Sequence, residues 1–109
     1  AGFSFGGSIA AHLIPQLKTA YPTLALLDLV QVAPAVENFP IEADLLHDVP
    51  RAVIFNSDDE VVSPEAIATY ARSVGATVFR SESGGHFFHG ELTRLKSTVA
   101  AHYQSRGVL

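Results

Sequence analysis

The sequence contains no cysteine, and this absence removes several kinds of chemistry. Without cysteine there is no disulfide framework, no thiolate metal ligand and no cysteine nucleophile. No apolar run approaches the roughly 20 residues that a membrane-spanning helix needs, so we expect no membrane partner. The net charge is −4, which gives no electrostatic reason to bind nucleic acid or an anionic membrane surface.

Methionine is also absent, so the chain is not a complete translation product that retains its initiator. Ala1 stands where the strand that leads into the first motif should just have ended. We therefore expect residues 1–109 to be the C-terminal part of a single larger domain, with the N-terminal strands preceding Ala1. We expect a cytoplasmic protein, and any signal peptide would lie upstream of Ala1.

The chain is 48% hydrophobic and 17% charged, which suits an α/β domain whose strands are covered on both faces. Strands that alternate with helices predict a parallel sheet with right-handed crossovers. Gln31 falls in an apolar run, and a buried amide there needs hydrogen-bond partners. The predicted elements are a helix over 6–13 that Pro15 ends or bends, a strand over 26–33, a loop over 34–50 with one helical turn near 42–46, a strand over 51–56, a helix capped by Ser63 and ended by Gly75, an edge strand over 76–81 with mixed polarity, and a helix over 89–104 with Leu92, Leu95, Val99 and Tyr103 as its apolar stripe.

Three motifs follow one another along the chain: a serine in a glycine-flanked turn at Ser4, an acid pair at Asp58 and Asp59, and a histidine at His86. The order serine, acid, histidine is the order found in α/β-hydrolases, and it differs from that of the chymotrypsin-like and subtilisin-like folds. The three motifs together predict acyl transfer to water.

The serine turn needs its glycines if Ser4 is a nucleophile on a tight strand-to-helix junction. Residues two before and two after such a serine come close in space, so Gly2 and Gly6 remove side chains that would collide. The following helix points its N-terminus at the reacting centre, which makes the backbone N–H of Phe5 an oxyanion donor. The alternative is a glycine-rich loop with an incidental serine. The turn lacks the lysine and the spacing of a phosphate-binding loop.

The acid motif follows a short apolar strand at its carboxyl end, where open α/β sheets place their sites. Asp58 and Asp59 are both candidates there. The alternative for both is a solvated turn ahead of a capped helix.

His86 follows Gly84 and Gly85, which let the chain turn sharply and present the ring. The alternatives are a surface histidine or a metal pair with His89. A pair of histidines without a third ligand is a poor metal site, so we expect no metal. The remaining histidines have no comparable context and are expected at the surface: His12, His47 and His102.

With these motifs the chain resembles the C-terminal half of a small α/β-hydrolase. It is most similar to compact bacterial serine hydrolases that carry His-Phe-Phe-His-Gly around the catalytic histidine, and the likeness covers essentially all of the chain. In that pattern the acid stands just before the residue that precedes the paired valines, which selects Asp59 over Asp58. Two departures are Asn56-Ser57, in place of a small or glycine-containing lead-in, and Pro15. The matching segments are Gly2–Gly7 as nucleophile elbow, Val32–Pro34 as the end of the next strand, Asp59–Val62 as acid turn and His86–Gly90 as histidine loop.

The resemblance implies that Ser4 attacks an acyl carbonyl, that His86 accepts and later returns its proton, and that Asp59 orients the imidazole. It implies no cofactor, and a second oxyanion donor from a segment outside this chain. Phe3, Phe87 and Phe88, together with Phe5, would give the pocket an apolar lining. For at least half of these four we expect core packing instead.

The segment between residues 33 and 51 is too short for a helical cap, which favours an open site and a small-molecule acyl substrate. A small ester is therefore the expected substrate of a carboxylesterase-like enzyme. An amide or peptide hydrolase with the same triad, and a non-catalytic binding module, remain alternatives. We expect this chain alone to be nearly inactive, and to self-associate through the exposed apolar edge that the missing strand leaves.

Overall fold

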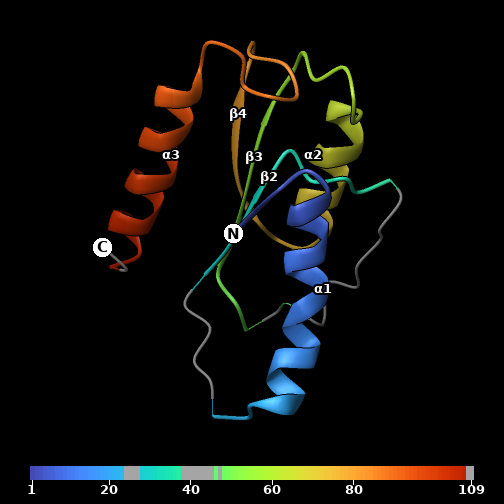
Figure 1. Ribbon diagram of the computed structural model, residues 1–109, viewed down its shortest axis with the longest axis vertical. Coiled ribbons are helices and arrows are strands. Elements are labelled where there is room, and N and C mark those ends of the chain that lie inside the picture. Colours follow the sequence, from blue (N-terminus) through green and yellow to red (C-terminus); the bar gives the residue numbers. More distant parts are fainter. Residues whose placement is uncertain (24–27, 38–45, 47, 108–109) are drawn as a thin grey trace.

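The computed structural model describes residues 1–23, 28–37, 46 and 48–107 of the chain. Figure 1 shows the strands in the middle, with α3 on one side of them and α1 and α2 on the other. The elements are β1 (Gly2–Phe3), α1 (Phe5–Ala20), β2 (Leu29–Val32), β3 (Arg51–Asn56), α2 (Pro64–Ser73), β4 (Thr77–Ser81) and α3 (Leu92–Ser105).

The sheet has the order β1-β2-β3-β4, and every neighbouring pair is parallel. The predicted α/β fold class is therefore confirmed, and β4 occupies an edge as its mixed pattern indicated. Because all the strands run the same way, their carboxyl ends lie at one edge of the sheet, where the loops that carry function usually begin. The prediction that the strand leading into Ser4 ends before Ala1 is wrong, because Gly2 and Phe3 pair with Gln31 and Val32.

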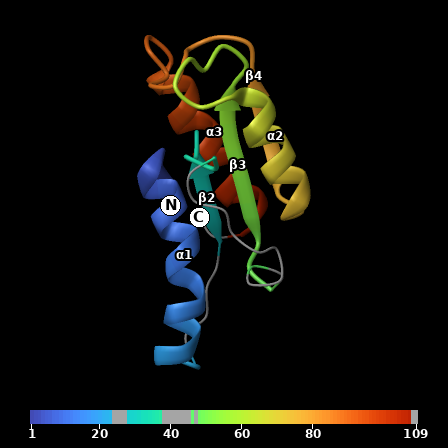
Figure 2. The same cartoon turned by 90° about the vertical axis from the view of Figure 1, so that its right-hand side faces the viewer.

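Alternate residues of the central strands point to opposite faces of the sheet, and each face has its own helical cover. Val53 and Phe55 pack against α2, whereas Ala52 and Ile54 belong to the cluster that contacts α3. α1 and α2 therefore cover one face, and α3 covers the other (Figure 2). Burial on both faces explains why the strand Arg51–Asn56 has no polar alternation in its sequence.

Helix α1 runs from Phe5 to Ala20 with Pro15 inside it. Of the two predicted effects of Pro15, ending or bending the helix, the first is therefore wrong. Proline removes one helical hydrogen bond, but Ala11 and Ile14 on the same helix are buried in a core cluster with β2. Tertiary packing of the turn before the proline offsets the local cost.

Helix α2 has the ends that its sequence predicted. The Ser63 hydroxyl accepts a hydrogen bond from the Ala66 amide, and Pro64 occupies the first helical position. At the other end Gly75 has a φ of 63°, a left-handed geometry that glycine adopts without steric cost. The predicted start and stop are both confirmed.

Helix α3 begins at Leu92, three residues later than the predicted start at residue 89. Leu92 is 65% exposed, so it does not belong to the buried stripe that was predicted. The rest of the predicted stripe packs against the core cluster between α3 and the sheet: Leu95, Val99 and Tyr103. The apolar stripe therefore starts one turn later than the sequence pattern indicated.

His102, expected at the surface, is buried at 5% exposure. Its Nε2 lies 2.9 Å from the Oδ2 of Asp28, whose side chain is also buried. The prediction was wrong because His102 lies on the sheet-facing side of α3, where the acid at the start of β2 gives it a partner. His12 is exposed as predicted, and His47 lies outside the described residues.

The buried amide of Gln31 has the partners that its position required. Its Nε2 donates to the Gly7 carbonyl at 2.9 Å, and its Oε1 accepts from the Tyr70 hydroxyl at 2.7 Å. One side chain of β2 thus joins the first turn of α1 to α2.

The predicted helical turn near 42–46 lies outside the described residues apart from Leu46. In the part of the chain that the structure describes, no helix is both long and apolar enough to cross a membrane.

Candidate active site

Ser4 lies at the sharp turn between β1 and α1, in a strained backbone geometry. Its φ of 53° and ψ of −121° are unusual for a residue with a side chain. The turn is nonetheless fixed, because the Ser4 amide donates to the Val32 carbonyl at 2.8 Å and the Ser4 carbonyl accepts from the Gly7 amide at 3.0 Å. Strain of this kind persists only where the surrounding structure over-determines the residue, and it is typical of a nucleophile elbow.

The glycines around Ser4 differ in how much they are needed. A Cβ on Gly2 would lie 2.2 Å from the Gly6 carbonyl oxygen, which no side chain can tolerate without movement. A Cβ on Gly6 would meet nothing within 4 Å, so the prediction that Gly6 avoids a collision is wrong. The close approach falls instead on Gly7, whose Cβ would be 3.0 Å from the Gly2 carbonyl oxygen. The chain turns so sharply that Gly2 lies under the peptide between residues 6 and 7.

Asp59 lies just beyond the carboxyl end of β3, and both of its oxygens have partners. Its Oδ1 accepts from the backbone amides of Val61 and Val62, both at 2.8 Å. Its Oδ2 lies 2.8 Å from Nδ1 of His86. The two valine amides hold the carboxylate in the orientation that presents its second oxygen to the ring. Asp58 does not contact the imidazole, and its carboxylate accepts from the amides of Gly84 and Gly85 instead.

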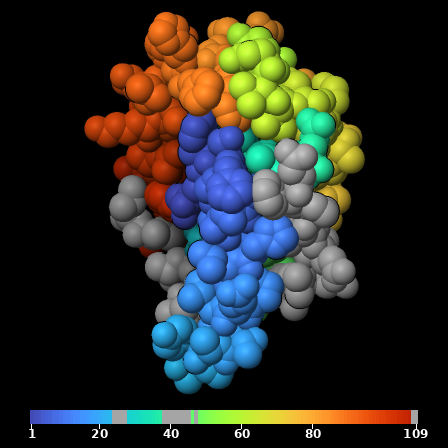
Figure 3. Space-filling view, turned by 45° about the vertical axis from the view of Figure 1, so that its right-hand side comes forward, coloured from blue at the N-terminus to red at the C-terminus, as the bar shows by residue number. Residues whose placement is uncertain are grey.

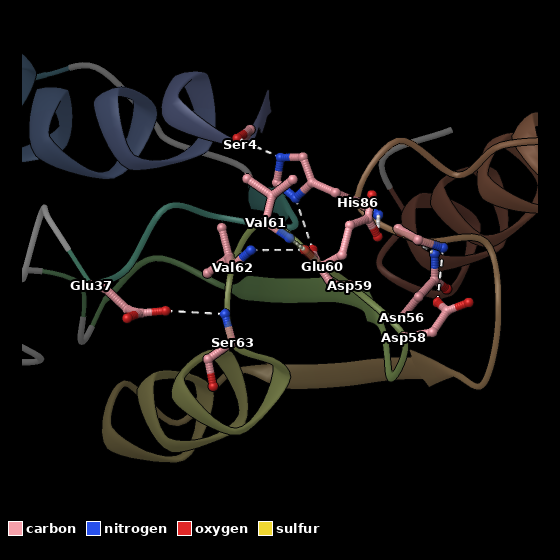
Figure 4. Close-up of polar contacts among 11 residues, drawn as sticks. Ser4, Glu37, Asn56, Asp58, Asp59, Glu60, Val61, Val62, Ser63 and His86 are labelled. Atoms are coloured by element: carbon pink, nitrogen blue, oxygen red, sulfur yellow. Dashed lines mark hydrogen bonds and ion pairs between the residues drawn. The ribbon is translucent and has the colours of Figure 1, made fainter.

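The imidazole of His86 joins the other two side chains into one line (Figure 4). Its Nε2 lies 2.8 Å from the Ser4 hydroxyl, and its Nδ1 lies 2.8 Å from Asp59. The ring is buried at 2% exposure, and the rings of Phe3 and Phe87 lie against it at centroid distances of 5.2 and 4.9 Å. With the proton on Nδ1 donated to the carboxylate, Nε2 is free to accept the serine proton.

The three side chains come from distant parts of the sequence but from one edge of the sheet. Figure 3 shows the N-terminal residues, in dark blue, meeting the orange segment that carries His86 and the yellow-green acid turn. The elbow follows β1, the acid turn follows β3, and the histidine loop follows β4. Parallel pairing of these strands is what brings the three motifs together.

Neither a protein-family model nor a curated protein sequence matches this chain. Solved structures do. An alpha-beta serine hydrolase homologue from Coxiella burnetii shares 31% sequence identity and a TM-score of 0.68, over 93% of this chain and 46% of its own. The chain belongs to the α/β-hydrolase superfamily.

Two further structures support the fold at lower identity. MGS-MChE2, an α/β-hydrolase enzyme from a metagenome of sediments of the Mar Chica lagoon in Morocco, has 17% identity and a TM-score of 0.70 over 97% of this chain and 60% of its own. The ydeN gene product of B. subtilis has 16% identity and a TM-score of 0.66 over 89% of this chain and 62% of its own. The chain thus spans about half the length of the α/β-hydrolases that it matches.

Phe5 is the first residue of α1, so its backbone amide lies at the positive end of the helix dipole and next to Ser4. This is the place that an α/β-hydrolase uses for one oxyanion donor. Phe5 as a residue is 53% exposed.

The aromatic side chains that were expected to line a pocket do lie together. Phe3, Phe87 and Phe88 line a cavity of about 200 Å³ with Val32, Leu92 and Leu95. Only Phe88 is part of the buried core, whereas Phe3, Phe5 and Phe87 are 42%, 53% and 63% exposed. The expectation that at least half of the four pack in the core is therefore wrong. The reason is that Phe3 and Phe87 stack around His86 at the rim of the sheet rather than beneath it.

His89 is exposed and lies apart from the line of Ser4, His86 and Asp59. Among the described residues, no three side chains of the metal-binding types converge on one point.

Several site residues were not identified by sequence reasoning. Gly7, Asn56 and Glu60 all contact the elbow or the histidine loop, yet none stood out by residue type. A usable signal was the run of three acids at 58–60 together with Gly84-Gly85. Backbone amides exposed by a glycine pair need acceptors, and the neighbouring acid turn supplies them.

Proposed function

We propose that this protein is a serine hydrolase that cleaves small carboxylic esters through an acyl-enzyme intermediate. The observation that carries the proposal is the unbroken line from the Ser4 hydroxyl through His86 to Asp59, with both hydrogen bonds at 2.8 Å. A serine alone is a weak nucleophile. A base within hydrogen-bond reach, itself oriented by a third group, is the arrangement that activates it.

In the proposed reaction, Ser4 Oγ attacks the ester carbonyl carbon as its proton passes to Nε2 of His86. The imidazolium that forms is stabilised by Asp59, whose Oδ2 accepts from Nδ1. When the tetrahedral intermediate collapses, the same Nε2 proton goes to the departing alkoxide. A water molecule then repeats the sequence on the acyl-enzyme and releases the acid.

The negative oxygen of the tetrahedral intermediate needs donors that are already in place. The Phe5 amide, at the N-terminus of α1, supports this role because it adjoins the attacking oxygen and shares the helix dipole. Losing one such donor costs roughly 10²–10³ in turnover. The chain spans about half the length of its structural relatives, and the second donor is expected outside it. Its turnover should therefore be compared with that of its own variants.

The preference for a small substrate follows from the size of the neighbouring cavity. At about 200 Å³, the cavity lined by Phe3, Phe87 and Phe88 is smaller than the ~300–1,000 Å³ typical of drug-sized ligand sites. Its lining is apolar, which suits a short acyl chain better than a charged or long one.

The test is covalent labelling of the protein with a fluorophosphonate probe, followed by an ester panel. We expect the probe to modify Ser4, Ser4→Ala to abolish labelling, and p-nitrophenyl acetate and butyrate to be hydrolysed faster than aminoacyl p-nitroanilides. A preference for the anilides would favour the amide or peptide hydrolase instead. Absence of labelling would leave the chain as a binding module with a hydrolase fold. Weak ester turnover with labelling intact is instead the result expected when a second oxyanion donor lies outside this chain.

A further inference from the structure

Three consecutive acids, Asp58, Asp59 and Glu60, all face the histidine loop, but each contacts a different part of it. Asp59 binds the imidazole of His86. Asp58 accepts from the backbone amides of Gly84 at 3.2 Å and Gly85 at 2.8 Å. Glu60 accepts from the backbone amide of His86 at 3.4 Å, the weakest contact of the set.

The glycine pair also has two carbonyl groups. The Gly84 carbonyl accepts from the His89 amide at 2.8 Å, and the Gly85 carbonyl is bound by Asn56. The Asn56 Nδ2 donates to this carbonyl at 2.9 Å, and the side chain is fully buried. Arg94 donates to the Asn56 Oδ1 at 3.2 Å and to the Ser83 carbonyl at 3.0 Å, so the amide cannot turn over without losing a partner. Asn56 and Asp58 lie on the opposite side of His86 from Ser4 (Figure 4).

The backbone that these side chains bind is the most permissive in the site. Gly84 and Gly85 have φ angles of 124° and 65°, which only glycine adopts readily. A glycine pair leaves many conformations open, and each of them would place the next residue differently. The contact is also close, because a Cβ on Gly84 would lie 2.8 Å from Asn56 Nδ2.

We propose that Asp58 and Asn56 are positioning residues for His86. Asp58 holds the amides of Gly84 and Gly85, Asn56 holds the Gly85 carbonyl, and together they remove the freedom of the glycine pair. The imidazole is thereby set at hydrogen-bond distance from both Ser4 and Asp59. The catalytic consequence rests on the proposed function, but the placement of the ring does not.

The scale of the effect follows from geometry. A displacement of a reacting group by 1 Å costs about 10²-fold in rate. Because Glu60 and Asn56 still hold the loop when Asp58 is removed, we expect Asp58→Ala to lower the rate of Ser4 labelling by roughly 10- to 100-fold.

The first measurement is the proton NMR resonance of His86 Nδ1–H, assigned by its loss in His86→Gln. In the unaltered chain this proton lies between the ring and Asp59 and should exchange slowly with water. In Asp58→Ala we expect exchange at least tenfold faster, with the far-ultraviolet circular dichroism unchanged. Asn56→Asp, which keeps the size but loses the donor, should have the same effect on the resonance.

Two further variants separate positioning from charge. Asp58→Asn removes the charge but keeps one acceptor oxygen, so positioning predicts a result between the unaltered chain and Asp58→Ala. A purely electrostatic effect predicts that Asn and Ala behave alike, which would overturn the proposal. Glu82→Gln removes an exposed acid of the same loop, and neither exchange nor labelling should change.

Unaltered exchange and labelling in both Asp58→Ala and Asn56→Asp would also overturn the proposal. Failure of the proposed function is recognised separately. If the unaltered chain neither reacts with the fluorophosphonate nor hydrolyses esters, the hydrolase assignment fails, and the exchange of the Nδ1 proton still decides whether Asp58 and Asn56 position the ring.

Discussion

Replacing Gly2 by alanine is a direct perturbation of the serine turn, and Gly6→Ala is its matched control. The alanine methyl group at position 2 would lie 2.2 Å from the Gly6 carbonyl oxygen and 2.6 Å from the Gly7 nitrogen. The same group at position 6 would meet nothing within 4 Å. The two substitutions add the same atom on either side of Ser4, but only the one at position 2 creates a steric overlap.

The magnitude follows from the overlap. Because ordinary Cβ contacts begin near 3.4 Å, the backbone at position 2 must move by about 1 Å, and such a displacement of the nucleophile costs about 10²-fold in rate. Overpacking also destabilises a fold by about 1–3 kcal/mol. Gly6→Ala should leave the rate unchanged and stabilise α1 by up to about 1 kcal/mol, because alanine is the better helix former. Gly7→Ala, with a contact of 3.0 Å, should fall between them.

The assay is the second-order rate of fluorophosphonate labelling at Ser4, with urea unfolding measured on the same samples. The order of rates should be Gly6→Ala, then Gly7→Ala, then Gly2→Ala. If Gly6→Ala loses as much reactivity as Gly2→Ala, the turn does not have the geometry described, and the argument from steric overlap is refuted.

Three other substitutions test separate parts of the structure. Asp59→Asn should lower ester turnover by about 10⁴-fold because the amide favours the wrong imidazole tautomer, and near-normal turnover would remove Asp59 from the triad. Burial raises the pKa of Tyr70 above its usual 10.0, although the hydrogen bond to Gln31 acts in the opposite direction. The neutral phenol therefore stabilises the fold below pH 10, and this stabilisation is lost as the pH rises through the pKa of the folded state. Tyr70→Phe should therefore lower the free energy of unfolding by about 1–3 kcal/mol at pH 7, because it leaves the Gln31 oxygen unpaired. In urea unfolding, the difference in free energy between the two proteins should become smaller above pH 10. A difference that does not change with pH would contradict this reasoning. His102→Ala should cost about 1–3 kcal/mol in the same assay because Asp28 Oδ2 loses its hydrogen bond to the ring and keeps only Arg106, at 3.5 Å. A loss below about 0.5 kcal/mol would mean that the pair contributes little.

The features predicted correctly from the sequence are those that local chemistry specifies. The strand Arg51–Asn56 is a short apolar run between a proline and a turn, and the structure gives it those bounds. Ser63-Pro64 and Gly75 mark the two ends of α2 by capping and by left-handed geometry. The line of the three site side chains was expected from the resemblance to a family and not from local chemistry, and their catalytic roles stay a prediction.

The features that were missed depend on distant contacts. Pro15 is tolerated within α1 because Ile14 is buried against β2, and no local rule contains that contact. His102 was placed at the surface because its partner, Asp28, lies 74 positions away. The need for Gly7 rather than Gly6 depends on where the Gly2 carbonyl lies after the turn, which residue spacing alone does not specify.

The hydrogen bonds of His86 reach residues 82 and 27 positions away. A newly made chain therefore carries an ordinary alcohol at position 4, no more reactive than any exposed serine. The hydroxyl acquires its base only when strands from both ends of the sequence have assembled into the same sheet. In the proposed mechanism, reactivity therefore begins only with folding, and a misassembled copy would leave esters intact.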